Sequence, residues 1–239
     1  NTINHSRIAA ANPFERFAAA VLPPGVAPDV EARFRSLARH VEAAAGDAPL
    51  DYLEQDQIVF VASGATKLVA RATLGREQIV AFHFAGDLVS LPERRRHSYS
   101  LVALQQSEFL AFLASDFLAS AQHASALANE ILRRSLISLS RCREKSIMLG
   151  RKTAQERLAS FLVTMADRIG MQQGGQCVLD LPMSRRDIAD SLGLTIETVS
   201  RQLTVLRDLA LIETSGRSIV TLADIAALED RAGHLAVAA

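Results

Sequence analysis

With 239 residues, 49% of them hydrophobic, the chain can bury one large core or two modest ones, and we expect two domains joined by a helix. The formal net charge is zero, which argues against a polycation, so a surface that binds nucleic acid has to be a local patch. No apolar run reaches the ~20 residues of a membrane-spanning helix, and two cysteines can neither build a disulfide framework nor ligate an iron–sulfur cluster alone. We therefore expect a protein of the reducing cytoplasm without a membrane partner.

Residues 1–48 are rich in alanine, and prolines separate a short apolar segment from residues 29–44, where charged and apolar residues interleave. We interpret residues 1–48 as a helical lead-in with a helix over 29–44. Residues 49–114 instead contain short runs rich in Val, Ile and Phe, punctuated by glycine and proline, which is typical of antiparallel strands and tight turns. This second stretch predicts a small β-barrel or jelly roll.

Glycine and proline are absent from Ser115 to Leu149, and Ala, Leu, Arg and Glu dominate, which predicts one long helix over 115–150. Some of its small or apolar positions repeat in alternating steps of four and three, the spacing of a coiled-coil seam. We predict that this seam joins two copies of the chain; the alternative is that the same stripe packs on the chain's own barrel. The seam consists of Ala128, Leu132, Ser135, Leu139, Cys142, Ser146 and Leu149.

A second domain is expected over 151–239. Thr153, followed three residues later by Glu156, is the signature of a capping box at the start of a helix. Glycines between residues 170 and 175 then predict a loop, and the alternating pattern of 177–181 predicts a strand.

After this strand the pattern is that of two helices joined by a sharp turn. Ser184 can cap the first helix, with Asp187 at its third position. Gly193 can adopt the positive φ angle that the turn needs, and Thr195 can cap the second helix. The second helix, 196–208, has an apolar face that we expect to be buried, made of Ile196, Val199, Leu203 and Leu206.

The other face of the second helix carries Glu197, Thr198, Ser200, Arg201 and Thr204. These residues lie on its first turns, the part of a recognition helix that enters the major groove of DNA. Arg201 can donate two bonds to guanine, and Glu197 can accept one from cytosine. Ser200 and Thr198 can contact thymine methyl groups or phosphates. Because DNA phosphates repel a carboxylate, we also expect Glu197 to pair with Arg201.

Residues 212–221 predict a two-stranded hairpin that turns at Ser215–Gly216, the wing of a winged helix-turn-helix. We expect Arg217, at the start of its second strand, to bind DNA phosphates together with other groups near the first helix. Any one of these arginines taken alone fits an ordinary solvated side chain equally well. The phosphate-binding set is Arg185, Arg186, Thr195 and Arg217.

Barrel, long helix, capped helix pair and wing, in this order, resemble the CRP/FNR family of transcription regulators over about residues 50–232. Residues 181–201, which read LPMSRRDIADSLGLTIETVSR, are similar to the DNA-binding signature of the FNR and FixK branch of that family. Residues 81–88, AFHFAGDL, are similar to the barrel motif of the branch. Residues 153–158 are similar to the family's join between dimerisation helix and DNA-binding domain.

The resemblance implies an α+β fold with an N-terminal cyclic-nucleotide-binding-like β-barrel (jelly roll), a long dimerisation helix and a C-terminal winged helix-turn-helix. It implies a homodimer that binds double-stranded DNA at an inverted repeat of TTGAT-type half-sites, with Glu197, Ser200 and Arg201 reading the bases. It also implies contact with RNA polymerase. The dimer seam would then include Leu132, Leu139, Cys142 and Leu149.

The barrel departs from the family's cyclic AMP pattern, which is Gly-Glu-Leu followed by an Arg-Ser or Arg-Thr pair. Here Asp87 replaces the glutamate, and the basic loop of Arg94, Arg95 and Arg96 lacks the matching pair. We expect no cyclic AMP; the three arginines either bind another anion or form an exposed charged turn. The first 60 residues contain no cysteine, and the histidines lack a haem-ligand spacing, so no cofactor is expected.

Two further departures favour a dimer that needs no ligand. The barrel is short around residues 50–57, where longer family members have extra strands, and a reduced barrel loses room for a ligand. Cys142 stands on the seam where oxygen-sensing relatives have an acidic residue, so a like-charge repulsion between subunits is removed. A redox role for Cys142 is an open alternative.

Three interpretations of function differ in what the barrel does. The first is a regulator without a small-molecule ligand, controlled by its amount or by modification. The second is a regulator gated by an unidentified small-molecule effector in the barrel. The third, a cupin-like enzyme, needs clustered metal ligands, yet the sequence contains no His-x-His, no Gly-x-Ser-x-Gly and no His-Glu-x-x-His. We expect no enzyme, and no catalytic or metal-binding residues.

Overall fold

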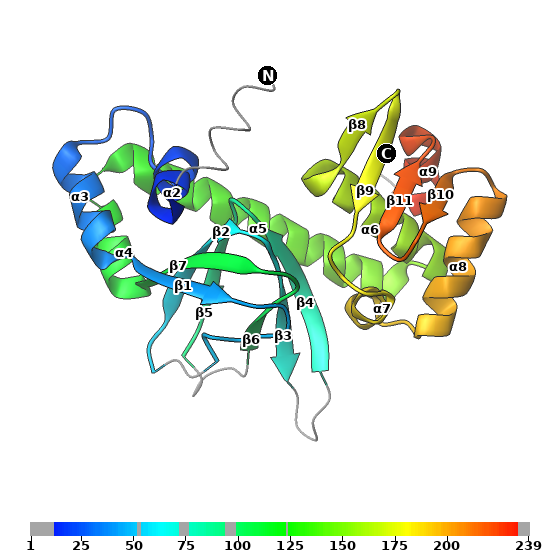
Figure 1. Ribbon diagram of the computed structural model, residues 1–239, viewed down its shortest axis with the longest axis horizontal. Helices are drawn as coiled ribbons and strands as arrows, with labels where there is room; N and C mark the ends of the chain where they lie inside the picture. The colour runs from blue at the N-terminus through cyan, green and yellow to red at the C-terminus, as the bar shows by residue number, and fades with distance from the viewer. Residues whose placement is uncertain (1–11, 52–53, 72–76, 94–98, 123, 234–239) are drawn as a thin grey trace. The chain divides into compact units, whose positions relative to one another are not determined.

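The computed structural model describes residues 12–51, 54–71, 77–93, 99–122 and 124–233 (Figure 1). The chain divides into two compact units, residues 1–140 and 141–239. The first unit holds the β-rich part and the second holds the helix-turn-helix. The predicted α+β fold class, an N-terminal β core followed by a C-terminal winged helix-turn-helix, is confirmed.

The first unit is built on two antiparallel sheets. One has the strand order β1-β7-β2-β5 and the other β4-β3-β6. The strands are β1 (Arg39–Ala43), β2 (Gln57–Ser63), β3 (Ala65–Arg71), β4 (Glu77–Phe84), β5 (Leu88–Leu91), β6 (Tyr99–Ala103) and β7 (Ser107–Leu113). Their inward side chains fill the barrel with a compact apolar core that includes Val59, Val61, Leu91, Leu101 and Phe109.

Helices α2 (Pro13–Val21), α3 (Pro28–Leu37) and α4 (Ala114–Ala121) pack together with strands β2 and β7 in a second core of the first unit. Phenylalanines dominate this core: the ring centroids of Phe17 and Phe112 are 5.1 Å apart, as are those of Phe34 and Phe117. Such tilted and edge-on pairs are favourable arrangements of aromatic rings. The core therefore fixes the helical cover to one wall of the barrel.

The helix predicted over 29–44 is wrong in its second half. Helix α3 ends at Leu37, and Arg39–Ala43 form strand β1, which pairs with β7. Val41 and Ala43 alternate into the barrel core, and this burial outweighs the helical preference of the segment. The β-structure therefore begins before residue 49, and residues 1–48 are not a purely helical lead-in.

The single helix predicted over 115–150 is also wrong, because the structure has two helices there. Helix α4 ends at Ala121, and helix α5 (Ser125–Arg151) begins after a break. Phe117 and Leu127 both lie in the phenylalanine-rich core. On one continuous helix these two residues would be separated by ~15 Å along the axis, and the break brings both side chains into the same core.

The second unit contains α6 (Ala154–Ile169), β8 (Met171–Gln173), β9 (Gln176–Asp180), α7 (Arg185–Leu192), α8 (Ile196–Asp208), β10 (Ile212–Ser215), β11 (Ile219–Leu222) and α9 (Ile225–Ala232). Its sheet has the order β10-β11-β9-β8. The predicted strand at 177–181 is confirmed as β9, but part of the loop predicted over 170–175 is strand β8, which pairs with it. None of the described helices is long and apolar enough to span a membrane.

Candidate nucleic-acid interface

Helix α7 begins with the capping box that the sequence predicts. The Ser184 hydroxyl accepts a hydrogen bond from the Asp187 backbone N–H at 3.1 Å, and the Asp187 carboxylate accepts from the Ser184 N–H at 2.9 Å. Asp187 is buried at the helix N-terminus, where its negative charge also interacts favourably with the positive end of the helix dipole. The direction of α7 is therefore fixed at its first turn.

The turn between α7 and α8 depends on a left-handed residue. Gly193 has φ +62° and ψ +40°, and its N–H donates to the Ala189 carbonyl. The Leu194 N–H donates to the same carbonyl at 3.0 Å. Side chains other than glycine are strained in this backbone conformation, which explains why glycine occupies the position. The sharp inter-helix turn expected at Gly193 is confirmed.

Helix α8 is capped by Thr195, whose hydroxyl accepts from the Thr198 N–H at 3.2 Å. Val199, Leu203 and Leu206 are buried as predicted, and Ile196 is half-buried. The opposite face is open to solvent: Glu197, Arg201 and Thr204 are exposed, and Thr198 and Ser200 are half-buried. The candidate base-reading residues therefore share the accessible face of the first two turns of α8.

Glu197 remains ionised on this face. Hydrogen bonds from its own backbone N–H and from the Thr195 hydroxyl lower the pKa of the Glu197 carboxyl below its usual range. Within the described residues, Glu197 and Arg201 form no ion pair with each other, so the expected pairing is not present. Both side chains are exposed, and a carboxylate acceptor stands beside a guanidinium donor on one accessible surface.

The wing is a hairpin in which Ser215 pairs with Ile219. Residues 216–218 form its tip, and Gly216 takes a positive φ of +63°. Arg217 is exposed in this tip, whereas the sequence placed it at the start of the second strand. Strand β11 also pairs with β9, so the hairpin is continuous with the sheet of the second unit.

Arg185 of α7 and Arg217 of the wing line the same small cavity of the second unit, so the structure brings these two predicted phosphate-binding residues together. Arg186 is exposed on the first turn of α7 next to Arg185. All three arginines lie in the same compact unit as helix α8.

Helix α5 carries an exposed apolar stripe. Leu132, Leu136 and Leu139 are 58%, 57% and 46% exposed. The other face of α5 is used within the first unit, where Leu127 is buried and Ile131 packs against the phenylalanine-rich core. The stripe therefore does not pack on the chain's own barrel, contrary to that alternative. Of the other seam residues in the prediction, Ala128, Ser135, Cys142 and Ser146 are exposed and Leu149 is half-buried.

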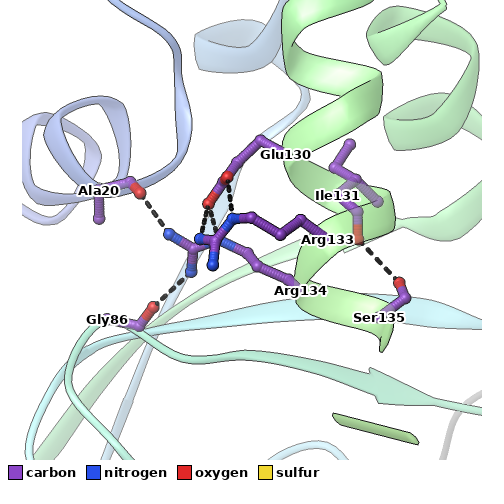
Figure 2. Close-up of polar contacts among 7 residues, drawn as sticks. All are labelled: Ala20, Gly86, Glu130, Ile131, Arg133, Arg134 and Ser135. Carbon is purple, nitrogen blue, oxygen red and sulfur yellow. Dashed lines mark hydrogen bonds and ion pairs between the residues drawn. The ribbon is translucent and has the colours of Figure 1, made fainter. Parts of the chain in front are cut away.

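Figure 2 shows how α5 is attached to the first unit. Arg134 donates to the carbonyl oxygens of Gly86, at 3.0 Å, and Ala20, and to the Glu130 carboxylate at 2.7 Å. Arg133 donates to the same carboxylate at 2.7 and 2.8 Å. Hydrogen bonds from Arg133 and Arg134 lower the pKa of Glu130 to about 2. Nothing in the sequence pattern signalled the role of Arg134, because the two backbone carbonyls that it binds lie far away along the chain.

The Asp87 side chain binds the backbone of its own turn. The Asp87 carboxylate accepts from the Phe84 N–H at 2.8 Å, and Gly86 has φ +95°. Asp87 therefore stabilises the β4–β5 turn at the position where cyclic-AMP-binding relatives have glutamate. The candidate anion loop of Arg94, Arg95 and Arg96 lies outside the described residues.

Three buried side-chain polar atoms have no hydrogen-bond partner among the described residues: Asp51 Oδ1, the Thr66 hydroxyl oxygen and His83 Nε2. The last two lie on neighbouring strands of the barrel. Thr66 pairs with His83 across β3 and β4 and with Ala103, a member of the barrel core, across β3 and β6. A buried polar group without a partner is costly, so this pair is a place where water or a ligand would be stabilised.

Donor atoms of His40, Glu42 and Glu108 lie within 4.8 Å of one another on strands β1 and β7. The Glu108 carboxylate already accepts from Arg16 at 2.8 Å and from Ser63 at 2.9 Å. These bonds, together with Arg16 and His40, lower the pKa of Glu108, against the opposing effect of its partial burial. An ion-pair network joining α2 to the barrel accounts for this cluster.

A capped helix pair with an exposed polar face and an adjoining wing defines a DNA-binding module of the winged helix-turn-helix class. Residues 156–231 match the family described as the Crp-like helix-turn-helix domain. The nitrogen fixation regulation protein FixK of Rhizobium meliloti is 36% identical over 157 residues, which cover 66% of this chain and 69% of that protein. The transcriptional activatory protein AadR of Rhodopseudomonas palustris is 33% identical over 180 residues, 75% of each chain.

Among solved structures, FixK2 from Bradyrhizobium japonicum is similar with a TM-score of 0.73 and 30% identity, covering 83% of this chain and 99% of that one. The chain belongs to the CRP/FNR family, in its FixK-like branch. It is a DNA-binding transcription regulator.

Proposed function

We propose that the protein binds DNA as a homodimer at an inverted repeat of TTGAT-type half-sites, and that Glu197, Ser200 and Arg201 read the bases. The observation that carries this proposal is the division of α8 into two faces. Val199, Leu203 and Leu206 hold the helix on the domain core, and the polar residues of its first turns face outward. A rigid helix with an outward polar end is what major-groove recognition requires.

Each outward side chain suits a particular base edge. Arg201 donates two parallel hydrogen bonds to the O6 and N7 atoms of guanine. The pKa of Glu197 is lowered, so its carboxylate is an acceptor of hydrogen bonds. It can accept one from the N4 amino group of cytosine, whereas a phosphate would repel it. Ser200 and Thr198 contact thymine methyl groups or a neighbouring phosphate. The sequence preference thus comes from a few groups on one helix face.

Phosphate contacts supply affinity without sequence preference. Arg185 and Arg217, which line one small cavity, and the exposed Arg186 bind the DNA backbone beside the groove. The Thr195 hydroxyl and the N-terminal end of α8 offer a further polar contact to a phosphate. These contacts place α8 in register with its bases.

The dimer forms through α5. An exposed stripe of Leu132, Leu136 and Leu139 on a helix of 27 residues is a surface that a second copy of the same helix covers. Cys142 and Leu149 extend the seam into the second unit. No acidic residue lies on the proposed seam, so the two helices associate without repulsion between carboxylates at the seam. In this account residues 115–150 contain the dimerisation element and residues 151–239 the DNA-binding domain.

The regulator acts without cyclic AMP and without an iron–sulfur cluster. A cluster of buried apolar side chains forms the core of the barrel, and Asp87 is used by the β4–β5 turn. Control then comes from the amount of protein or its modification, in the cytoplasm, where the dimer contacts RNA polymerase at its promoters.

A second candidate is a regulator gated by a small polar effector. It is favoured by the buried Thr66 hydroxyl and His83 Nε2, which lack partners among the described residues. An effector that supplied those hydrogen bonds would stabilise the barrel and change operator affinity.

Titration of purified, additive-free protein against a fluorescent TTGAT-type inverted repeat and a scrambled duplex, at one fixed salt concentration, tests the proposal. Light scattering of the free protein and of the complex gives the stoichiometry. We expect a dimer that prefers the repeat by at least about a thousandfold. A monomer in both states contradicts the dimer, and equal affinity for both duplexes contradicts the operator. Preference that emerges only after addition of cell metabolites supports the gated alternative.

A further inference from the structure

The guanidinium of Arg157, in the first turns of α6, holds three segments of the second unit together. Its Nη2 donates to the carbonyl oxygen of Leu149 at 2.8 Å, and its Nε donates to that of Lys152 at 2.9 Å. Its Nη1 donates to the carbonyl oxygen of Leu192 at 3.0 Å. Leu149 lies in the last turn of α5, Lys152 follows that helix, and Leu192 is the last residue of α7.

These acceptors have a common physical character. The last carbonyls of a helix have no partner within the helix and form the negative end of its dipole. Arg157 therefore places one cation at the C-terminal ends of two helices, α5 and α7, and satisfies carbonyls in both. A planar guanidinium donates in fixed directions, so bonds to three carbonyls define the relative orientation of the segments that carry them.

The position of this side chain connects it to recognition. Leu192 immediately precedes Gly193, whose left-handed conformation turns the chain into the recognition helix α8. Residues 141–151 of α5 belong to the same compact unit as α7 and α8. We propose that Arg157 is a positioning residue: it sets the angle between residues 141–151, the end of the dimerisation helix, and the recognition helix, and through it the half-site spacing that the dimer accepts. The proposal rests on the homodimer and inverted repeat proposed above.

Spacing is a sensitive readout of such an angle. Each added base pair moves the second half-site by about 3.4 Å and rotates it around the DNA axis. A dimer whose two recognition helices are held at one angle binds one spacing well and its neighbours poorly. A dimer whose helices pivot tolerates several spacings but binds the best of them more weakly, because ordering the helices on DNA then costs entropy.

Arg157→Lys is the informative variant. It keeps the positive charge near the two helix ends, but an ammonium on a flexible stem cannot reproduce the planar fork that spans three carbonyls. Lys152→Met is the matched control. The Lys152 ammonium is also part-buried in the same segment and donates to the Ser160 hydroxyl at 2.8 Å and the Ala232 carbonyl at 2.6 Å. Those bonds join α6 and the end of α9, and they do not hold α7.

The first measurement is the affinity of the wild type, Arg157→Lys and Lys152→Met for four duplexes. Three are inverted repeats, one with the preferred half-site spacing, one shorter by a base pair and one longer by a base pair. The fourth contains a single half-site. We expect the wild type to favour one spacing by about tenfold or more. Arg157→Lys should lose most of this preference while its single half-site affinity stays within about twofold. Lys152→Met should keep the wild-type preference. A wild-type spacing preference in Arg157→Lys, or an equal loss on every duplex including the half-site, overturns the proposal.

The second measurement does not depend on the operator. A spin label is attached to Asp208→Cys, at the end of α8, in a Cys142→Ser background. Pulsed electron paramagnetic resonance then reports the distance between the two recognition helices of the dimer. We expect a narrow distribution in the parent and in Lys152→Met, and a broad one in Arg157→Lys. Identical distributions contradict the role of Arg157. A wild type that binds no TTGAT repeat refutes the proposed operator alone, since the label distances still test the angle.

Discussion

Removing the Arg134 side chain should destabilise the first unit well beyond what an exposed arginine contributes. Its guanidinium donates to the backbone carbonyls of Ala20 and Gly86 and to Glu130, joining α2, the β4–β5 turn and α5 (Figure 2). Hydrogen bonds from charged donors contribute roughly 1.5–3 kcal/mol each. Two circumstances reduce the sum over the three acceptors: the Ala20 contact is exposed, and Glu130 keeps its hydrogen bonds from Arg133. We therefore expect Arg134→Ala to lower the free energy of unfolding by about 2–4 kcal/mol.

The assay can be restricted to the first unit. The chain has two tyrosines, Tyr52 and Tyr99, and no tryptophan, and both tyrosines lie within residues 1–140. Tyrosine fluorescence during urea denaturation therefore follows that unit. Arg133→Ala is the matched control, because Arg133 is 59% exposed and its hydrogen bonds go to Glu130 alone among the described residues; it should leave the free energy of unfolding nearly unchanged.

Equal changes in the two variants, or a loss below about 1 kcal/mol for Arg134→Ala, would refute the idea that this side chain binds the helix to the barrel.

Three other predictions concern the seam, a cap and the acid stability. Leu136→Asp should convert the dimer to monomer in light scattering, because a carboxylate buried at the seam would face its copy; an unchanged dimer contradicts the seam. Ser184→Ala should lower the free energy of unfolding by about 1 kcal/mol through loss of the α7 cap, measured by urea denaturation, whereas no loss means that the cap is dispensable. Since the pKa of Glu130 is lowered from 4.5 to about 2, its contribution to stability is complete above pH 4.5 and is lost as the pH falls toward 2. Melting temperatures across this range should fall more steeply in wild type than in Glu130→Gln; parallel slopes contradict the assignment.

The elements that local signals define were predictable from the sequence. Local sequence predicts the roles of the capping residues Ser184 and Thr195 and of the turn residue Gly193, because each interacts with atoms only a few positions away. The apolar face of α8 follows from helical spacing for the same reason. These features determine the helix-turn-helix almost entirely.

The features that the sequence did not reveal depend on partners far along the chain. Strand β1 forms because Arg39–Ala43 pair with β7, about seventy residues later, and the break before α5 lets Phe117 and Leu127 share one core. Arg134 and Arg157 donate to carbonyls 35 or more positions away as well as to near neighbours. No local pattern distinguishes such arginines from solvated ones.

The most direct test of base reading by α8 compares Arg201→Ala with Arg217→Ala on the TTGAT repeat, on a repeat with its guanine replaced, and on scrambled DNA at one salt concentration. We predict that Arg201→Ala loses about 1–3 kcal/mol on the repeat and no longer distinguishes it from the guanine-replaced duplex. Arg217→Ala should weaken all three duplexes similarly, because it contacts phosphate. An Arg201→Ala variant that loses equal affinity for the repeat and for scrambled DNA would contradict the account.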